Sequence, residues 1–260
     1  MYCKNFKFLT ILQNLLIMLQ YLKGNKETKN EKEIYPPPYS LKAFTLSEVL
    51  ITLVIIGIIA AITIPSIIAE YRDSERSARV KKCYTTIANA MTMAQAMGAE
   101  MDFSVEDENN AYMKDWVNSY LKPNLSATKV CYNTNGCWNN GHTKLKDGTI
   151  DYFSREGIGV GYNIITAVLN DGSFINIDAY RKNDIKNKFG VNIKDEYGLI
   201  FYFDINGARE PNTIGSDIFA VVYKNGTIVP AFSDRTKAQI EADCSSTGSG
   251  RACILKYLKQ

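Results

Sequence analysis

The stretch "LKAFTLSEVLITLVIIGIIAAITIPSIIAEYR", residues 41–72, decides the fold because it carries a continuous apolar run. Within residues 46–69 the only charged side chain is Glu48. About 20 apolar residues suffice to cross the ~30 Å hydrocarbon layer of a membrane. We therefore expect residues 44–69 to form a transmembrane helix, in preference to a buried core helix or a pair of strands. Lysines in front of the run favour a cytoplasmic N-terminal side and an exported domain behind it.

The helical pattern continues beyond the apolar run. Apolar or small residues recur at the i, i+3, i+4, i+7 spacing of one helix face, at Val80, Cys83, Tyr84, Ile87, Met91, Ala94 and Met97. This predicts one helix over residues 44–97, about 80 Å long, whose second half is amphipathic and needs a partner surface. Gly98 is a suitable C-terminal stop. Pro65 interrupts the backbone hydrogen-bond ladder and is expected to kink or loosen the helix.

Residues 1–43 have the composition of a leader. A short apolar run within residues 1–23 is interrupted by polar side chains, and residues 24–40 are charged and then proline-rich. We exclude residues 1–43 from the fold. They hold seven Lys against three Glu, so the net charge of +3 leaves −1 for residues 44–260. That balance does not favour a nucleic-acid partner. Translation starting at Leu41 would give a minimal leader, and peptides from residues 1–40 would exclude that hypothesis.

The second half of the chain has the pattern of an antiparallel sheet. "GYNIITAVLNDGSFINIDAY", residues 161–180, reads as two strands around the turn Asn170-Asp171-Gly172, and residues 217–232 read as a hairpin around Asn225-Gly226. "YGLIFYFDI", residues 197–205, is a further strand, and a short helix is expected over residues 106–121. The amphipathic helix and the sheet must bury their apolar faces together. The predicted fold class is α+β, a long N-terminal helix packed on a C-terminal antiparallel sheet, with residues 70–260 as the globular domain.

The segment "AFTLSEVLITLVIIGIIAAITIP" resembles the N-terminal segment of type IV pilins and type II secretion pseudopilins. The resemblance implies cleavage by prepilin peptidase between Ala43 and Phe44, and methylation of the new amino terminus at Phe44. Glu48 then becomes the fifth mature residue, and Gly57 and Pro65 fall where the family tends to place a glycine and a helix-kinking proline. The close resemblance covers residues 42–72. It departs from the family at Ala43, where glycine is usual, and small size at this position still suits the peptidase.

Glu48 is a carboxylate in an apolar helix, and such a group is treated as functional by default. The resemblance implies that it pairs with the Phe44 amine of a neighbouring subunit, which would fix the axial register of a filament because mispairing leaves two charges unpaired. The alternative is a solvated carboxylate stabilised by its place in the first helical turn.

Four of the six cysteines form two close pairs, Cys131 with Cys137 and Cys244 with Cys253. Disulfides, free thiols and a metal site are the three possibilities. Zinc sites prefer shorter spacings or histidine partners, and His142 is the only histidine. We favour disulfides, which would place the domain in an oxidising compartment. Cys83 lies on the apolar helix face and is expected to pack as a small hydrophobic side chain.

Residues 201–219 offer the oxygen ligands Asp204, Asn206 and Asp217 near glycines. Calcium needs six to eight such oxygens. Gly215 stands where the glutamate of an EF-hand loop would be, so the match to that motif fails. The stretch loosely resembles the calcium-binding loop that some pseudopilins carry in the C-terminal domain. The alternative is a polar turn held by local hydrogen bonds.

The expected function is that of a non-enzymatic structural subunit, since one histidine and no nucleophile motif disfavour catalysis. The resemblance implies other pilin or pseudopilin subunits, prepilin peptidase, an inner-membrane assembly machinery and lipid as partners. It leaves a pilus, a secretion pseudopilus and a DNA-uptake fibre open. The alternative function is a membrane-anchored, exported ligand- or calcium-binding domain that does not polymerise.

Overall fold

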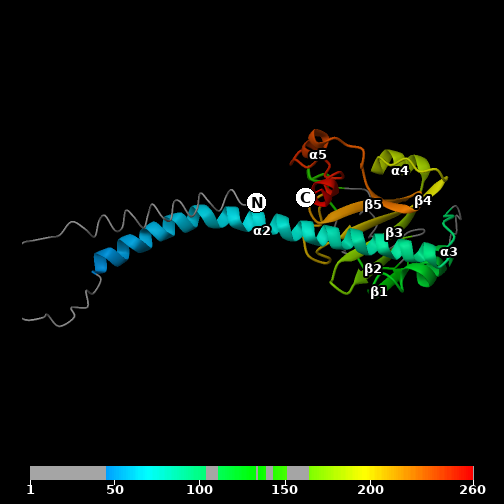
Figure 1. Cartoon of the computed structure of the whole chain (residues 1–260), viewed down its shortest axis with the longest axis horizontal. Helices are drawn as coiled ribbons and strands as arrows, with labels where there is room; N and C mark the ends of the chain where they lie inside the picture. Colours follow the sequence, from blue (N-terminus) through cyan, green and yellow to red (C-terminus); the bar gives the residue numbers. More distant parts are fainter. Residues whose placement is uncertain (1–44, 104–110, 133, 139–142, 151–163, 260) are drawn as a thin grey trace, which may run out of the picture. The chain divides into compact units, whose positions relative to one another are not determined.

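The computed structural model describes residues 45–103, 111–132, 134–138, 143–150 and 164–259. The predicted leader, the cleavage site Ala43–Phe44 and His142 lie outside these residues. The chain divides into two compact units, Met1–Ile58 and Ile59–Gln260. In the first unit the described residues are helical from Leu46 onward. The second unit contains the sheet and the remaining helices (Figure 1).

Helix α2 runs from Leu46–Ala96, which confirms the predicted long helix to within two residues at each end. Pro65 lies inside α2 without ending it. The C-terminus is closed at Gly98, whose φ of 78° is left-handed. The Gly98 N–H donates to Gln95 O at 2.9 Å and the Ala99 N–H donates to Ala94 O at 3.1 Å, the paired bonds of a Schellman motif. Glycine is needed there because a Cβ penalises left-handed backbone.

The sheet has six strands in sequential order, each antiparallel to its neighbours. The strands are β1 Ala127–Tyr132, β2 Ile165–Leu169, β3 Phe174–Arg181, β4 Tyr197–Asp204, β5 Ile218–Lys224 and β6 Thr227–Pro230. Both predicted hairpins are confirmed. Asn225 and Gly226 have φ values of 49° and 87° between β5 and β6, the two left-handed positions of a type I′ turn. The α+β prediction is therefore correct.

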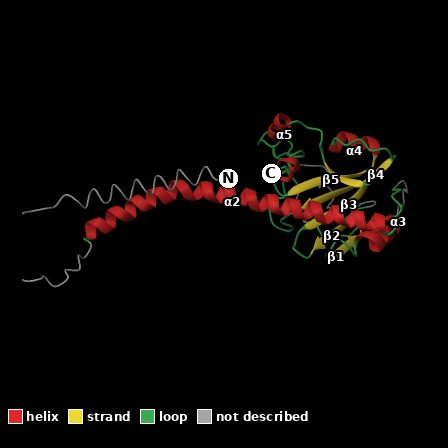
Figure 2. Cartoon of the chain, in the orientation of Figure 1, coloured by secondary structure: helices red, strands yellow, loops and turns green. Residues whose placement is uncertain are grey.

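Helix α2 packs across one face of the sheet (Figure 2). Val80, Cys83 and Ile87 are fully or almost fully buried in the same apolar cluster as alternate residues of the central strands, such as Phe201 and Phe203. Burial raises the pKa of the free Cys83 thiol to about 11, so Cys83 packs as a neutral, apolar side chain, as predicted.

The opposite sheet face is also buried, by a second apolar cluster that includes Phe189, Ile200 and Tyr202. Phe189 belongs to α4 Lys182–Phe189, a helix that the sequence analysis did not predict. Burial on both faces explains why β4 is a continuous apolar run and not an alternating one.

The remaining helices are α3 Ala111–Trp116, the π-helical turn η1 Val117–Leu121, α5 Lys237–Asp243 and α6 Ile254–Leu258. The predicted helix over residues 106–121 is confirmed from Ala111 onward, and residues 106–110 lie outside the described part of the chain. Two disulfides join Cys131 to Cys137 and Cys244 to Cys253, as predicted. The free-thiol and metal alternatives for these four cysteines are therefore dropped.

Candidate functional site

The N-terminus of α2 is capped by the side chains of Thr45 and Glu48. The backbone N–H and the hydroxyl of Thr45 donate to Glu48 Oε2 at 2.9 and 2.8 Å, and the Glu48 N–H donates back to Thr45 Oγ1 at 3.3 Å. This reciprocal arrangement is a capping box, which satisfies donors that the first helical turn leaves open. This cap was not predicted, although the Thr-x-x-Glu spacing of residues 45–48 is a readable signal for it.

The first half of α2 leaves its apolar side chains exposed. Leu46, Ile62 and Ile67 have 78%, 73% and 60% of their surface accessible, and the most apolar window of the helix, with a mean hydropathy of 2.7, is not buried at all. Among the described residues this is the one helix that is long and apolar enough to cross a membrane. A continuous apolar surface of this kind requires lipid or neighbouring apolar helices.

Hydroxyl groups beside Pro65 are satisfied within the helix. Thr63 Oγ1 donates to Ile59 O at 2.9 Å, and Ser66 Oγ donates to Thr63 O at 2.8 Å. Bonds of this kind allow polar residues and proline to be tolerated in an apolar environment. The predicted loosening at Pro65 stays a prediction, because the helical conformation continues through it.

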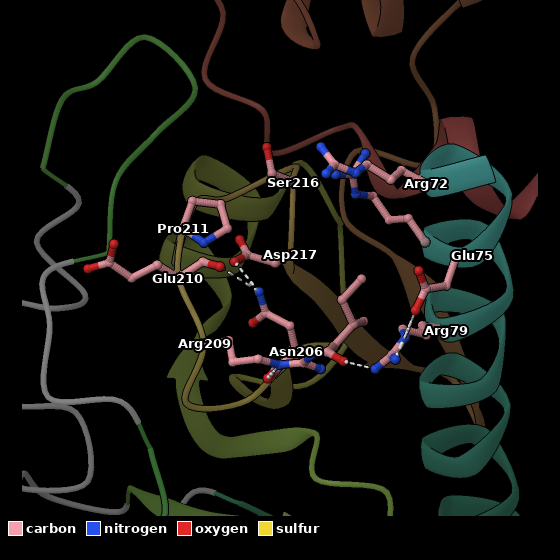
Figure 3. Close-up of a pocket in the computed structure, with 11 residues that line it drawn as sticks. Arg72, Glu75, Arg79, Asn206, Arg209, Glu210, Pro211, Ser216 and Asp217 are labelled. Atoms are coloured by element: carbon pink, nitrogen blue, oxygen red, sulfur yellow. Dashed lines mark hydrogen bonds and ion pairs between the residues drawn. The ribbon is translucent and has the colours of Figure 1, made fainter. Parts of the chain in front are cut away.

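The loop between β4 and β5 is organised by Asp217, which is buried (Figure 3). Its Oδ1 accepts the Thr213 N–H at 2.6 Å, and its Oδ2 accepts the Asn212 N–H at 2.8 Å and Asn206 Nδ2 at 3.0 Å. Burial raises the pKa of Asp217, and these three hydrogen bonds oppose the shift by favouring the charged form. The carboxylate therefore serves to hold the loop closed.

Asp204, at the end of β4, is also buried and accepts the N–H groups of Asn206 and Gly207 on one oxygen, at 3.0 and 3.1 Å. Gly207 has a left-handed φ of 63°, and a Cβ placed on it would lie 2.1 Å from Gly172 O in the β2–β3 turn. The local hydrogen bonds expected of a polar turn are therefore present in this loop.

The donor set meets the requirements of calcium only in part. Among the described residues, no group of three or more His, Cys, Asp and Glu side chains is placed to hold a metal ion. The Asp217 oxygens already accept N–H donors. The atoms that would suit a cation are Asn206 Oδ1 and Asn212 Oδ1, which are buried and accept no hydrogen bond in the described structure. The calcium site predicted at Asp204, Asn206 and Asp217 stays a prediction.

A groove next to this loop was not anticipated. It has a volume of about 230 Å³ and lies between α2 and the β4–β5 loop, with Arg72, Arg76 and Arg79 on the helix and Arg209 on the loop (Figure 3). The helical arginines are four and three residues apart, a spacing that places them on one helix face and that the sequence displays. Arg209 is remote in sequence, so its presence in the groove requires the fold.

Comparison with known proteins bears on the N-terminal segment of the chain. Residues 42–64 match the family model described as the prokaryotic N-terminal methylation motif. Neither a curated protein nor a solved structure matches the chain significantly. The matched residues include the Ala43–Phe44 bond, Glu48 and the start of α2. Residues 42–64 of this chain are therefore a prepilin-type segment, the signature of type IV pilins and pseudopilins.

Proposed function

We propose that the chain is a structural subunit of a type IV pilus-like or type II secretion pseudopilus filament. Prepilin peptidase cleaves it between Ala43 and Phe44, Phe44 is methylated, and an inner-membrane machinery assembles it with other pilin-type subunits through α2. One observation carries the proposal. The methylation motif at residues 42–64 overlaps the first half of α2, and in the described structure none of the apolar side chains of that half is buried.

The exposed apolar surface of the first half of α2 has two successive environments in this proposal. Before assembly it lies in the inner membrane as a single span, with the sheet-containing unit exported. After assembly it packs against the same helix of other subunits. Glu48 pairs with the methylated, cationic amine of Phe44 of a neighbouring subunit, which selects one register because a mispaired charge stays desolvated without a partner.

The capping box supplies a control for testing Glu48. Glu48→Ala removes both the cap and the proposed partner of the amine, whereas Thr45→Ala removes the hydroxyl of the cap and leaves the carboxylate in place. Losing a cap costs about 1 kcal/mol, and removing one member of a buried ion pair costs roughly 3–5 kcal/mol. We expect both variants to be cleaved normally and only Glu48→Ala to reduce filaments, by about tenfold or more.

The measurement is the amount of this chain in filaments sheared from a host with prepilin peptidase and the assembly machinery, with intact mass reporting cleavage and methylation. Normal filament yield from Glu48→Ala would refute the assembly role of the carboxylate. Equal losses from both variants would assign the effect to the cap. Absence of the chain from sheared filaments would refute the filament function.

A second candidate function is a membrane-anchored, exported calcium-binding domain that does not polymerise. The buried oxygens Asn206 Oδ1 and Asn212 Oδ1 favour it, because a cation could supply the partner that they lack. Calcium at millimolar concentration should then raise the melting temperature relative to EGTA, since a ligand that binds only the folded state stabilises it. Asn206→Ala should abolish the rise and Asn135→Ala, at an exposed position, should keep it. Identical melting with calcium and EGTA would contradict the site.

A further inference from the structure

A groove with a volume of about 560 Å³ lies between α2 and α6, and the charged residues that line it are both lysines. Lys81 lines it from α2, and Lys259 lines it from the residue that follows α6. Its apolar wall includes Tyr84 of α2 and Leu255 and Leu258 of α6. The Lys259 side chain is exposed and makes no ion pair with a described residue. This site is the basic groove.

A second groove, with a volume of about 320 Å³, lies at the C-terminal end of α2, and the charged residues that line it are both acidic. Glu100 follows the helix and Asp115 belongs to α3, and both are exposed. Neither carboxylate makes an ion pair with a described residue. The side chains of Tyr112, Trp116 and Tyr120 supply the aromatic part of the lining. This site is the acidic groove.

The acidic groove has the chemistry to receive lysine side chains. Burial raises the pKa of Tyr112, and the negative charges of Glu100 and Asp102 raise it further, so the field at this ring is negative. The rings of Trp116 and Tyr120 lie 5.9 Å apart. Aromatic faces attract ammonium groups, and carboxylates add charge-assisted hydrogen bonds.

The two grooves lie at opposite ends of the part of α2 that packs on the sheet. Helix α6 lies at the end nearer the apolar run, where Ser77 Oγ donates to Tyr257 O at 3.0 Å. Helix α3 lies at the other end (Figure 1), where Trp116 Nε1 donates to Glu100 O at 2.7 Å. From residue 85 in the basic groove to residue 98 in the acidic groove the helix rises about 20 Å. A copy displaced by this amount along α2 therefore has its basic groove level with the acidic groove of the copy below.

We propose that the basic groove of one copy of this chain binds the acidic groove of a second copy, with Lys81 and Lys259 facing Glu100 and Asp115. Two like grooves would oppose like charges, so the contact joins different surfaces of the two copies. Each copy then uses one groove for the copy above it and the other for the copy below, which builds an open array. This inference rests on the proposed filament and names a contact between its exported units.

The size of the grooves indicates that each contact is weak by itself. Two surfaces of this size bury less than a standard stable interface. Copies whose α2 helices are already held side by side gain the contact at a high effective concentration. The grooves therefore add to the assembly through α2 and do not replace it.

Charge reversal tests the contact, with the amount of the chain in sheared filaments as the measurement. We expect Lys81→Glu/Lys259→Glu and Glu100→Lys/Asp115→Lys each to lower the yield about tenfold, because like charges then meet across the contact. The variant with all four substitutions should return to near the wild-type yield, because the attraction is rebuilt with the signs exchanged. A variant that merely misfolds would not be rescued in this way.

The control Lys186→Glu/Lys194→Glu reverses two exposed lysines outside both grooves and should keep the wild-type yield. An equal loss from this control, or a fourfold variant that recovers nothing, would overturn the proposed contact.

Cross-linking identifies the occupant of the groove. Lys259→Cys/Glu100→Cys, treated with a bis-maleimide in filaments, should give dimers, trimers and longer products, because each copy carries one cysteine for each side of the contact. Each single variant should give dimers at most. Cys83, the free cysteine among the described residues, is buried and should not react.

The outcomes separate this contact from the filament function itself. Cross-links confined to a chain of another mass would assign the groove to a different subunit and overturn the proposal. Wild-type filaments whose yield is insensitive to both groove variants, and which give no ladder of products, would overturn the contact alone. A wild-type chain that never enters filaments would overturn the contact and the proposed function together.

Discussion

At the scale of single residues, the contact between Lys82 and Asp171 ties α2 to the turn between β2 and β3. Lys82 Nζ lies 2.7 Å from Asp171 Oδ2, and Asp171 Oδ1 accepts the Ser173 N–H at 3.0 Å. Partial burial raises the pKa of Asp171, but the hydrogen bonds from Lys82 and Ser173 outweigh it and lower the pKa from 3.8 to about 2. The folded protein therefore keeps this carboxylate charged under conditions where the unfolded chain protonates it.

This difference makes stability depend on pH. Because the folded pKa is depressed, the contribution of Asp171 is fully present above about pH 4 and is lost as the pH falls toward 2. We expect Asp171→Asn to lower the free energy of unfolding by about 1 kcal/mol at pH 7, after allowance for solvent screening, and to lower it by only a small fraction of that near pH 2. Urea unfolding of both proteins over pH 2–7 measures it. A deficit that is the same at every pH would show that the carboxylate charge is not the cause.

Glu48 shows how much of a residue's role can be predicted from its type and its position in the sequence. Its place in the first turn of an apolar helix was evident from the sequence, and so was its need for a partner. Among the described residues Thr45 is a partner of Glu48, and this contact stabilises the helix end whether or not a neighbouring subunit is present. The proposed pairing with the Phe44 amine of another subunit adds to the cap, because a carboxylate can accept several hydrogen bonds.

At the scale of elements, predictability follows the strength of the local pattern. Helix α2 and the β5–β6 hairpin were predicted because a sustained 3.6-residue period and an Asn-Gly turn are strong local signals. Strand β1 was missed because "ATKVCY" is mostly not buried and has no alternation. Its strand conformation depends on pairing with β2, a contact across more than 30 residues.

The short helices show a different limit of prediction from the sequence. Helix α5 begins with a capping box, in which the Gln239 N–H donates to Thr236 Oγ1 and Gln239 Oε1 accepts from Thr236, and this Thr-x-x-Gln spacing was readable. Helix α4 ends at Gly190 with a left-handed φ of 66°, also a readable stop, but only Ile185 and Phe189 of the helix are buried. Two apolar side chains do not define a period. The groove between α2 and the β4–β5 loop could not be predicted from the sequence, because Arg209 comes to line it beside the arginines of α2 only when the sheet has folded.

At the scale of the whole molecule, the main feature is the division of α2 into an apolar first half that is not buried and a second half that contributes to the core. From Leu46 to Arg76 no residue of α2 is buried, and burial begins at Ser77 and Val80. The apolar first half therefore contributes nothing to the core that the described residues form, although it contains the most apolar part of the chain. In the proposed function, this half of the helix serves processing, membrane insertion and assembly instead.

This division predicts that a fragment of residues 70–260 folds alone. It keeps every buried residue of α2, so we expect a soluble monomer with a single cooperative unfolding transition in circular dichroism and calorimetry. A fragment of residues 88–260 is the matched control. It lacks Val80, Cys83 and Ile87, and the loss of Val80 and Ile87 alone removes roughly 3–6 kcal/mol of apolar burial, much of the stability of an ordinary domain. Failure of the longer fragment to unfold cooperatively would mean that the apolar half of α2 is needed for the fold as well as for anchoring.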